Sequence, residues 1–288
     1  MKLKVIRVIL ALAAVSTMVV GCGEVVHLAL RPSVTQTDAM KVGDLTRSWE
    51  EIVPAGGLPA WAPIIVVLSG IGAPVPGEVT RDHFVPYATA GLAELVYPAG
   101  DKQSWNAGGC CGYAYRHDVN DVAFLTALAT RVDPDHMRPL YLVGYSNGGR
   151  MAYRMACSAP GVYNGYAIVK ADPQPGCVVS KPTTIVQVAS RNDNAVPYEP
   201  GDKGKETPAA TVQVSRLRSA AECGSQAATT RSGWLTFTQW HCADGTRVAF
   251  ALYASGAHDF PPPEKYEPAA AAVIWAFFSD AETIAPLP

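Results

Sequence analysis

The chain has almost no net charge and no long run of charge of one sign. Its 288 residues carry 23 Lys and Arg against 25 Asp and Glu, a formal net charge of −2. A nucleic-acid-binding protein usually shows a basic patch or stripe, so we expect no nucleic acid as a partner. The sequence also lacks a repeat at a fixed period and any low-complexity segment, which excludes repeat architectures.

Two further absences concern domains and metals. No stretch rich in Pro, Gly or Ser divides the chain after residue 60, so residues 61–288 are expected to form one domain. Hydrophobic residues make up 49% of the chain, enough for a sizeable core. No histidine lies at zinc-ligand spacing around the cysteines, so we expect no metal site.

The N-terminus has the architecture of an export signal, residues 1–21, and is expected to lie outside the fold. A basic start precedes an apolar run, residues 8–20, that is too short to span a bilayer comfortably. The closing tetrapeptide VVGC resembles the lipobox of bacterial lipoproteins, in which the signal is cut before the cysteine and the cysteine receives a lipid. This resemblance implies that Cys22 anchors an exported protein to the outer face of a membrane; the alternative is an ordinary cleaved signal. Residues 22–60 are expected to be the lipidated N-terminus and a tether.

Cysteine usage agrees with export. With Cys22 set aside, six cysteines remain, and an even number in an exported protein suggests disulfides. Six cysteines allow fifteen pairings, and the sequence alone does not choose among them. One pairing that closes short loops joins Cys157 to Cys177 and Cys223 to Cys242. It leaves the adjacent Cys110 and Cys111 as either a vicinal bridge or two free thiols.

Apolar runs of strand length alternate with helical patterns along the chain. Strands are expected at residues 63–69, 94–97, 140–143, 166–169, 183–189, 234–240 and 248–253, and helices at 81–95, 118–132, 209–221 and 269–278. The early strands are apolar throughout, as is typical of strands that are buried on both faces. The pattern therefore predicts an α/β fold with a mostly parallel, doubly wound sheet and helices on both faces.

One stretch, LYLVGYSNGGRMAYRMAC, indicates a strand, a sharp turn and a helix, with Ser146 at the turn. Gly144 and Gly148 flank the serine as in a nucleophile elbow, where glycines relieve the steric conflict of the strained serine with strand and helix. The N–H of Asn147 at the helix N-terminus is then placed to be one oxyanion donor. The alternative is that Ser146 is one more hydroxyl at a tight turn.

A nucleophilic serine needs a base, and in this kind of fold the chain order is serine, acid, histidine. His258 lies in a small-residue loop after the last strand and is the expected base, with His241 as the alternative. Asp193 follows the strand TTIVQVA and is the expected acid, with Asp172 as the alternative. The second oxyanion donor is expected to be the N–H of Ile71, in the loop after the first core strand.

Four motifs give the sequence a family resemblance: WNAGGCCG at 105–112, NDVAF at 120–124, GYSNGGRMAYRMAC at 144–157 and VPY at 196–198. Together they resemble the secreted esterase family that contains polyhydroxybutyrate depolymerases and feruloyl or acetyl-xylan esterases. The resemblance covers most of residues 60–280. It implies an α/β-hydrolase fold and a serine esterase that needs no cofactor, with an ester as its substrate. Ser146, Asp193 and His258 match the nucleophile, the acid and the base of that family.

Four aromatic residues fall in loops near the predicted site: Trp105, Tyr145, Tyr198 and Phe260. They are candidates to line an acyl or aryl pocket, and core packing is the alternative for each. Two other functions stay open on these residues alone. One is an acyltransferase on the same fold, and the other is a non-catalytic binding protein of the cell envelope.

Overall fold

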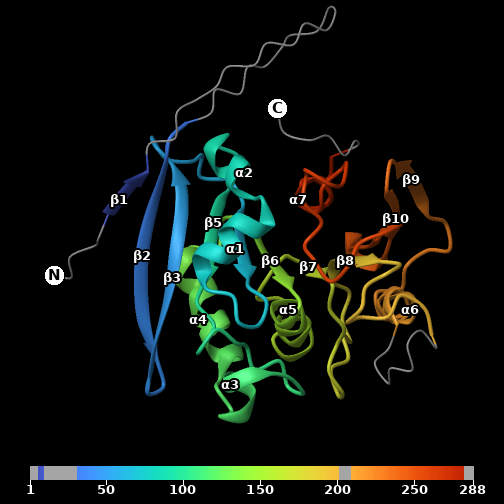
Figure 1. Cartoon of the computed structure of the whole chain (residues 1–288), viewed down its shortest axis with the longest axis horizontal. Coiled ribbons are helices and arrows are strands. Elements are labelled where there is room, and N and C mark those ends of the chain that lie inside the picture. Colours follow the sequence, from blue (N-terminus) through green and yellow to red (C-terminus); the bar gives the residue numbers. More distant parts are fainter. Residues whose placement is uncertain (1–5, 10–30, 201–208, 282–288) are drawn as a thin grey trace, which may run out of the picture.

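The structure is a computed structural model that describes residues 6–9, 31–200 and 209–281. Within these residues one sheet of eleven strands runs in the order β1-β2-β3-β5-β4-β6-β7-β8-β11-β10-β9 (Figure 1). The strands are β1 (Ile6–Ile9), β2 (Ser33–Val42), β3 (Leu45–Pro54), β4 (Ile64–Leu68), β5 (Glu94–Pro98), β6 (Leu140–Tyr145), β7 (Gly165–Val169), β8 (Thr184–Ser190), β9 (Ala228–Ser232), β10 (Leu235–His241) and β11 (Arg247–Tyr253). The helices are α1 (Val75–Asp82), α2 (Val85–Thr89), α3 (Gly112–Arg116), α4 (Asp121–Val132), α5 (Asn147–Ser158), α6 (Ala210–Ala220) and α7 (Ala270–Phe278).

The centre of the sheet is parallel and buried on both faces. Strands β5, β4, β6, β7, β8 and β11 pair in parallel, in that order. Along β4, Ile64 and Val66 pack into the core on the side of α4, α5 and α6, whereas Ile65 and Val67 pack on the side of α2 and α7. This alternation, which the strand's period of two dictates, confirms the predicted doubly wound sheet with helices on both faces.

Residues 33–54 are part of this sheet, so the prediction of a tether from residue 22 to 60 is wrong for them. Strands β2 and β3 form an antiparallel hairpin, and β3 pairs with β5 through Trp49 to Ile52. Trp49 and Ile52 are buried in the core. The hairpin escaped prediction because its strands carry charged and polar residues between the apolar ones, so neither contains a continuous apolar run.

The predicted export signal contributes one short strand to the described structure. Strand β1 pairs with β2 in antiparallel register, Ile6 opposite Gln36. This differs from the expectation that residues 1–21 lie wholly outside the fold. The physical reason is that an unpaired sheet edge accepts any extended segment through backbone groups alone. Cys22 lies outside the described residues, and both the signal and the lipid anchor stay predictions.

The helix expected at residues 81–95 is instead two short helices followed by β5. Pro76 and Pro86 stand in the first turns of α1 and α2, where a proline costs no hydrogen bond. His83 ends α1 in a left-handed conformation, at φ 60°. No helix among the described residues is long and apolar enough to cross a membrane.

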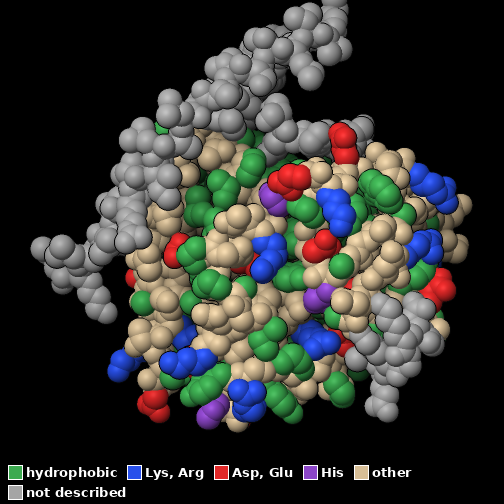
Figure 2. All heavy atoms as spheres, viewed as in Figure 1, with side chains coloured by type: hydrophobic (Ala, Val, Ile, Leu, Met, Phe, Trp, Pro, Cys, Tyr) green, Lys and Arg blue, Asp and Glu red, His purple; other side chains and the backbone are tan. Residues whose placement is uncertain are grey.

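The cysteines pair as the loop lengths predict. Disulfides join Cys157 to Cys177 and Cys223 to Cys242, and the adjacent Cys110 and Cys111 form the vicinal bridge. On the face of the molecule drawn in Figure 2, acidic and basic side chains are interspersed and no patch of one sign dominates.

Candidate active site

Ser146 lies at a tight turn between the central strand β6 and helix α5. Its backbone adopts φ 53° and ψ −116°, a conformation that is strained for a residue with a side chain. A Cβ atom on Gly144 would collide with the carbonyl of Gly148, and one on Gly148 would collide with the carbonyl of Leu68. The turn therefore requires glycine at both flanks of Ser146, which is the geometry that the G-x-S-x-G pattern predicts.

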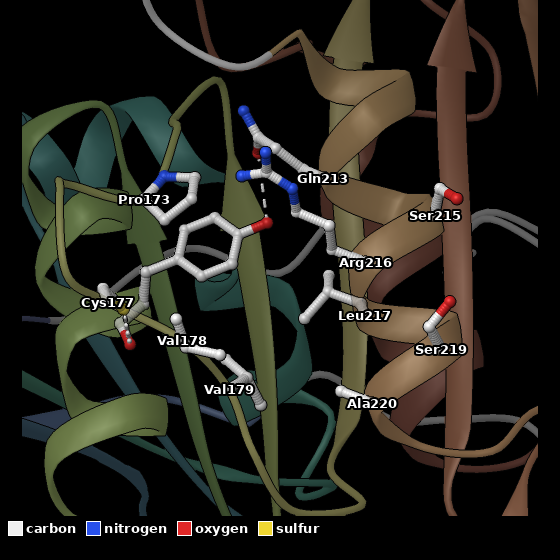
Figure 3. Close-up of a pocket in the computed structure, with 11 residues that line it drawn as sticks. Pro173, Cys177, Val178, Val179, Gln213, Ser215, Arg216, Leu217, Ser219 and Ala220 are labelled. Atoms are coloured by element: carbon white, nitrogen blue, oxygen red, sulfur yellow. Dashed lines mark hydrogen bonds between the residues drawn. The ribbon is translucent and has the colours of Figure 1, made fainter.

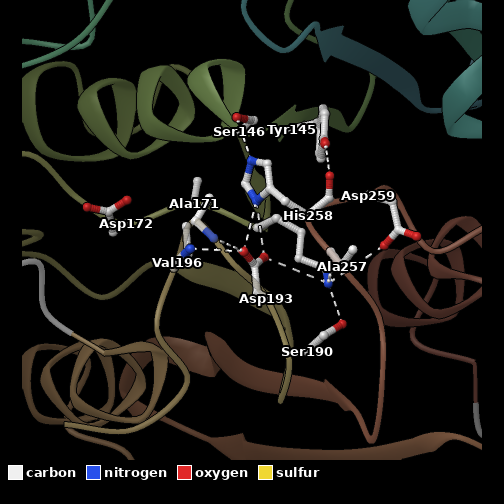
Figure 4. A network of polar contacts seen from close by, with 12 residues as sticks. Tyr145, Ser146, Ala171, Asp172, Ser190, Asp193, Val196, Ala257, His258 and Asp259 are labelled. Atoms are coloured by element: carbon white, nitrogen blue, oxygen red, sulfur yellow. Dashed lines mark hydrogen bonds and ion pairs between the residues drawn. The ribbon is translucent and has the colours of Figure 1, made fainter. Parts of the chain in front are cut away.

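The structure brings Ser146, His258 and Asp193 into one chain of hydrogen bonds (Figure 4). Ser146 Oγ lies 2.8 Å from His258 Nε2, and His258 Nδ1 lies 3.1 Å from both carboxylate oxygens of Asp193. An ionised carboxylate can only accept, so the Nδ1 proton points to Asp193 and the Nε2 lone pair faces the serine hydroxyl. This arrangement can remove a proton from Ser146.

Asp193 is held in its charged form although it is buried. Burial by itself would raise the pKa of Asp193, but hydrogen bonds from His258 and from the N–H groups of Val196 and Ala195 outweigh burial, so the pKa lies below its ordinary value. The two backbone N–H groups donate to Asp193 Oδ1 at 2.9 and 2.7 Å, respectively. The carboxylate is therefore ready to orient the imidazole at neutral pH.

The alternative acid and base lie in other interactions. Asp172 accepts two hydrogen bonds from Arg150, at 3.0 and 2.7 Å, instead of contacting the imidazole. His241 lies at the exposed end of β10, opposite Arg247. The structure thus assembles the expected pair and not the alternatives.

The two predicted oxyanion donors belong to the start of α5 and to the loop that follows β4. The N–H of Asn147 belongs to the first turn of α5, where N–H groups have no partner within the helix. The loop that contains Ile71 comes close to Ser146 at Gly70, where an added Cβ atom would lie 3.6 Å from the Cβ of Ser146. Within the part of the chain that the structure describes, the Ile71 N–H has no hydrogen-bond partner. The binding of an oxyanion by these two N–H groups stays a prediction.

The Asn147 side chain has a second role that the sequence did not indicate. Its amide oxygen accepts from the N–H of Trp105 at 2.8 Å, and its amide nitrogen donates to the carbonyl of Trp105 at 3.0 Å. This two-point contact fastens the loop of residues 105–111 to the start of α5. The same loop is held from its other end, because Arg150 donates to Cys110 Sγ at 2.8 Å.

The aromatic residues proposed for a substrate pocket are mostly core. Trp105 is 0% exposed and stacks on Phe124, and Phe260 is 2% exposed and packs edge-on against Phe84. For these two the pocket prediction is wrong, because large rings in loops also anchor those loops to the core.

The other two candidates have different surroundings. Tyr145 is largely buried, and its hydroxyl donates to the carbonyl of His258 at 2.7 Å, so it positions the base. Tyr198 is half-buried and stacks on Phe250 at 6.4 Å between ring centres. Of the four candidates, Tyr198 is the one that is not buried.

A cavity lies away from Ser146, Asp193 and His258. It has a volume of about 590 Å³ and is lined by α6, by Tyr153 of α5 and by the loop of residues 173–179 (Figure 3). None of Ser146, Asp193 and His258 lines it. Among the described residues, no group of three or more His, Cys, Asp and Glu side chains is placed to hold a metal ion.

Comparison with known proteins supports the fold. The chain is 14% identical to a thermostable esterase, with a TM-score of 0.52. The match covers 84% of this chain and 59% of the esterase chain. It is 11% identical to an acetyl xylan esterase from Aspergillus awamori (85% and 99% covered, TM-score 0.57). It is 15% identical to a "Putative Dienelactone Hydrolase" from Klebsiella pneumoniae subsp. pneumoniae MGH 78578 (86% and 99% covered, TM-score 0.55). The chain has the α/β-hydrolase fold.

One curated protein is similar in sequence. It is described as "Putative esterase NocK" from Nocardia uniformis subsp. tsuyamanensis, and it is 30% identical over 203 residues. The match covers 63% of this chain and 58% of the relative, so the chain spans less than two thirds of that protein's length. No protein-family model matches the sequence.

Proposed function

We propose that the protein is a serine esterase that hydrolyses carboxylic esters through Ser146, His258 and Asp193. The observation that carries the proposal is the hydrogen-bonded chain of these three side chains, with Ser146 on a glycine-flanked elbow. The similarity to proteins described as esterases agrees with it.

The geometry supports a two-step reaction. Ser146 Oγ attacks the ester carbonyl while His258 takes the serine proton and then passes it to the leaving alcohol. Asp193 fixes the ring and stabilises its charged form, and the N–H groups of Asn147 and Ile71 hold the oxyanion. Water, activated by His258, then hydrolyses the acyl-enzyme and regenerates Ser146. No cofactor takes part in these steps.

The proposal is tested by intact mass after reaction with a fluorophosphonate, which forms a stable adduct on an activated serine. The full protein should gain one adduct, Ser146→Ala should gain none, and Ser279→Ala, on an exposed serine after α7, should react like the wild type. Well-folded wild-type protein that gains no adduct would overturn the proposal and favour a binding protein.

The substrate and the location of the enzyme are finer parts of the same proposal. The motif resemblance and the acetyl xylan esterase neighbour support short acyl, feruloyl or hydroxybutyrate esters. A panel of these esters, with and without an added alcohol acceptor, separates hydrolysis from acyl transfer. We propose an extracytoplasmic, lipid-anchored protein on the VVGC motif, and Cys22→Ser should then abolish incorporation of a fatty acid at the N-terminus.

A further inference from the structure

A buried lysine lies beside the proposed acid and base. Lys170 directly follows β7, and its ammonium group donates to Ser190 Oγ and, at 2.9 Å, to the carbonyl of Ala257. Ser190 ends the strand that leads into the Asp193 loop, and Ala257 immediately precedes His258. One cation therefore contacts both loops that carry the acid and the base.

The same ammonium group faces two carboxylates. It lies 3.8 Å from Asp193 Oδ2 and 3.9 Å from Asp259 Oδ1 (Figure 4 shows both carboxylates beside His258). Within the described residues, that oxygen of Asp259 is buried and accepts no hydrogen bond. Lys265, which is exposed, lies 3.9 Å from the other oxygen of Asp259. Lys170 is thus the buried positive charge that Asp193 and Asp259 share.

Two features of Lys170 are unfavourable by themselves. Lys170 is only 1% exposed, and burial lowers the pKa of its ammonium to about 8 against the opposing effect of Asp193 and Asp259. Its backbone also adopts φ 53°, a left-handed conformation that costs about 1–2 kcal/mol for a residue other than glycine. The contacts of the side chain with the two loops are the interactions that can offset these costs.

The order of the strands explains why such a contact is needed. Ser146 follows β6, Lys170 follows β7, Asp193 follows β8 and His258 follows β11, and these strands are neighbours in that order. Strands are spaced about 4.8 Å apart, so the loop after β11 must reach back over roughly 14 Å to meet Ser146. The carbonyls of two successive residues in that loop are held, one by Lys170 and the other by Tyr145.

We infer that Lys170 is a positioning residue of the site: its ammonium group holds the Asp193 and His258 loops together and sets the charge balance in which the pair removes the serine proton. This inference rests on the proposed function. It predicts two separable effects of removing the cation. The serine adduct should form more slowly. In addition, as pH is lowered, reactivity should be lost at a higher pH than in the wild type. The second effect arises because uncompensated carboxylates favour the protonated, inactive form of the base.

The experiment measures the rate of fluorophosphonate adduct formation from pH 5.5 to 9 on the full protein, with folding monitored by circular dichroism. Lys170→Met keeps the stem and removes the charge. It should slow the reaction at pH 7 about 10-fold and move the acidic limb of the profile up by roughly one pH unit. Lys265→Met removes an exposed charge beside the same Asp259, and it should stay within about twofold of the wild type with an unmoved limb.

A second variant keeps the test decisive if Lys170→Met does not fold. Asp259→Asn removes a partly exposed carboxylate that shares the charge of Lys170. The positive charge of Lys170 is then less compensated beside Asp193 and His258, so the acidic limb of the profile should move to lower pH. Wild-type protein that reacts, with unmoved limbs in the folded variants, overturns the inference and leaves the proposed function intact. Wild-type protein that does not react overturns the proposed function itself.

Discussion

Replacing Arg47 by Met should destabilise the fold by about 3–5 kcal/mol, the cost of leaving one partner of a buried ion pair behind. Arg47 is 4% exposed and Asp121 is 0% exposed, and their charged groups lie 2.7 Å apart. The guanidinium also donates to the carbonyl of Ala99 at 3.1 Å and lies 4.1 Å from the centre of the Phe124 ring. All of these contacts join β3 to segments that lie after residue 60.

For a domain of this size, such a loss lowers Tm by about 6–20 °C. The effect should also depend on pH. Burial already raises the pKa of Asp121, against the opposing effect of Arg47, so without Arg47 the pKa rises further. The folded variant then binds a proton that the unfolded chain has lost, and its stability falls as pH rises from the ordinary Asp value of about 4 towards neutrality.

The control is Arg131→Met, which breaks an ion pair that also joins α4 to the hairpin but is exposed. Arg131 lies 2.7 Å from Asp38, and the two side chains are 55% and 27% exposed. Such pairs contribute about 0–1 kcal/mol. Urea unfolding followed by tryptophan fluorescence and circular dichroism measures both variants. Similar small losses in the two would refute the assignment of residues 33–54 to the domain core.

Three further predictions concern the site and its scaffold. Tyr145→Phe removes only the hydroxyl that holds the carbonyl of His258, and it should slow fluorophosphonate labelling about 3–10-fold with little change in Tm; unchanged labelling would contradict that role. Asp193→Asn should slow labelling about 10³–10⁴-fold at neutral pH. In the wild type, the free energy of unfolding that Asp193 contributes should be lost as pH falls below the ordinary Asp pKa of 3.8. Replacing Cys157 and Cys177 together by Ala should lower the free energy of unfolding by about 3 kcal/mol in urea titrations, and a loss below about 1 kcal/mol would show that the bridge does not constrain the unfolded chain.

The sequence predicts the parallel part of the sheet best. Strands β4, β6, β7 and β8 begin and end within about two residues of their predicted bounds, because strands buried on both faces leave continuous apolar runs. Hairpin β2–β3 leaves no such run, because Arg47 and the glutamates at positions 50 and 51 lie among its apolar residues. Its membership in the sheet depends on pairing with β5, which is a tertiary contact.

The candidate site also contains residues that the sequence predicts and one that it does not. Ser146, Asp193 and His258 are predictable because each lies in a small-residue loop that follows a recognisable strand, in a fixed chain order. Lys170 is not predictable, because a lysine at a strand end normally faces solvent. Only the order β7-β8-β11 places it under two later loops, and nothing local to residue 170 encodes that order.

The N-terminal hairpin is connected to Ser146 through a short series of buried contacts. Arg47 pairs with one oxygen of Asp121, and the other oxygen accepts from the N–H of Asn106 at 2.7 Å. The residue that precedes Asn106 is Trp105, whose backbone is held at two points by the Asn147 side chain beside Ser146. A domain that began at residue 61 would leave Asp121 buried without its cation and would weaken one of the supports of the loop that the Asn147 side chain holds. The smallest unit that preserves the site therefore includes the hairpin of residues 33–54.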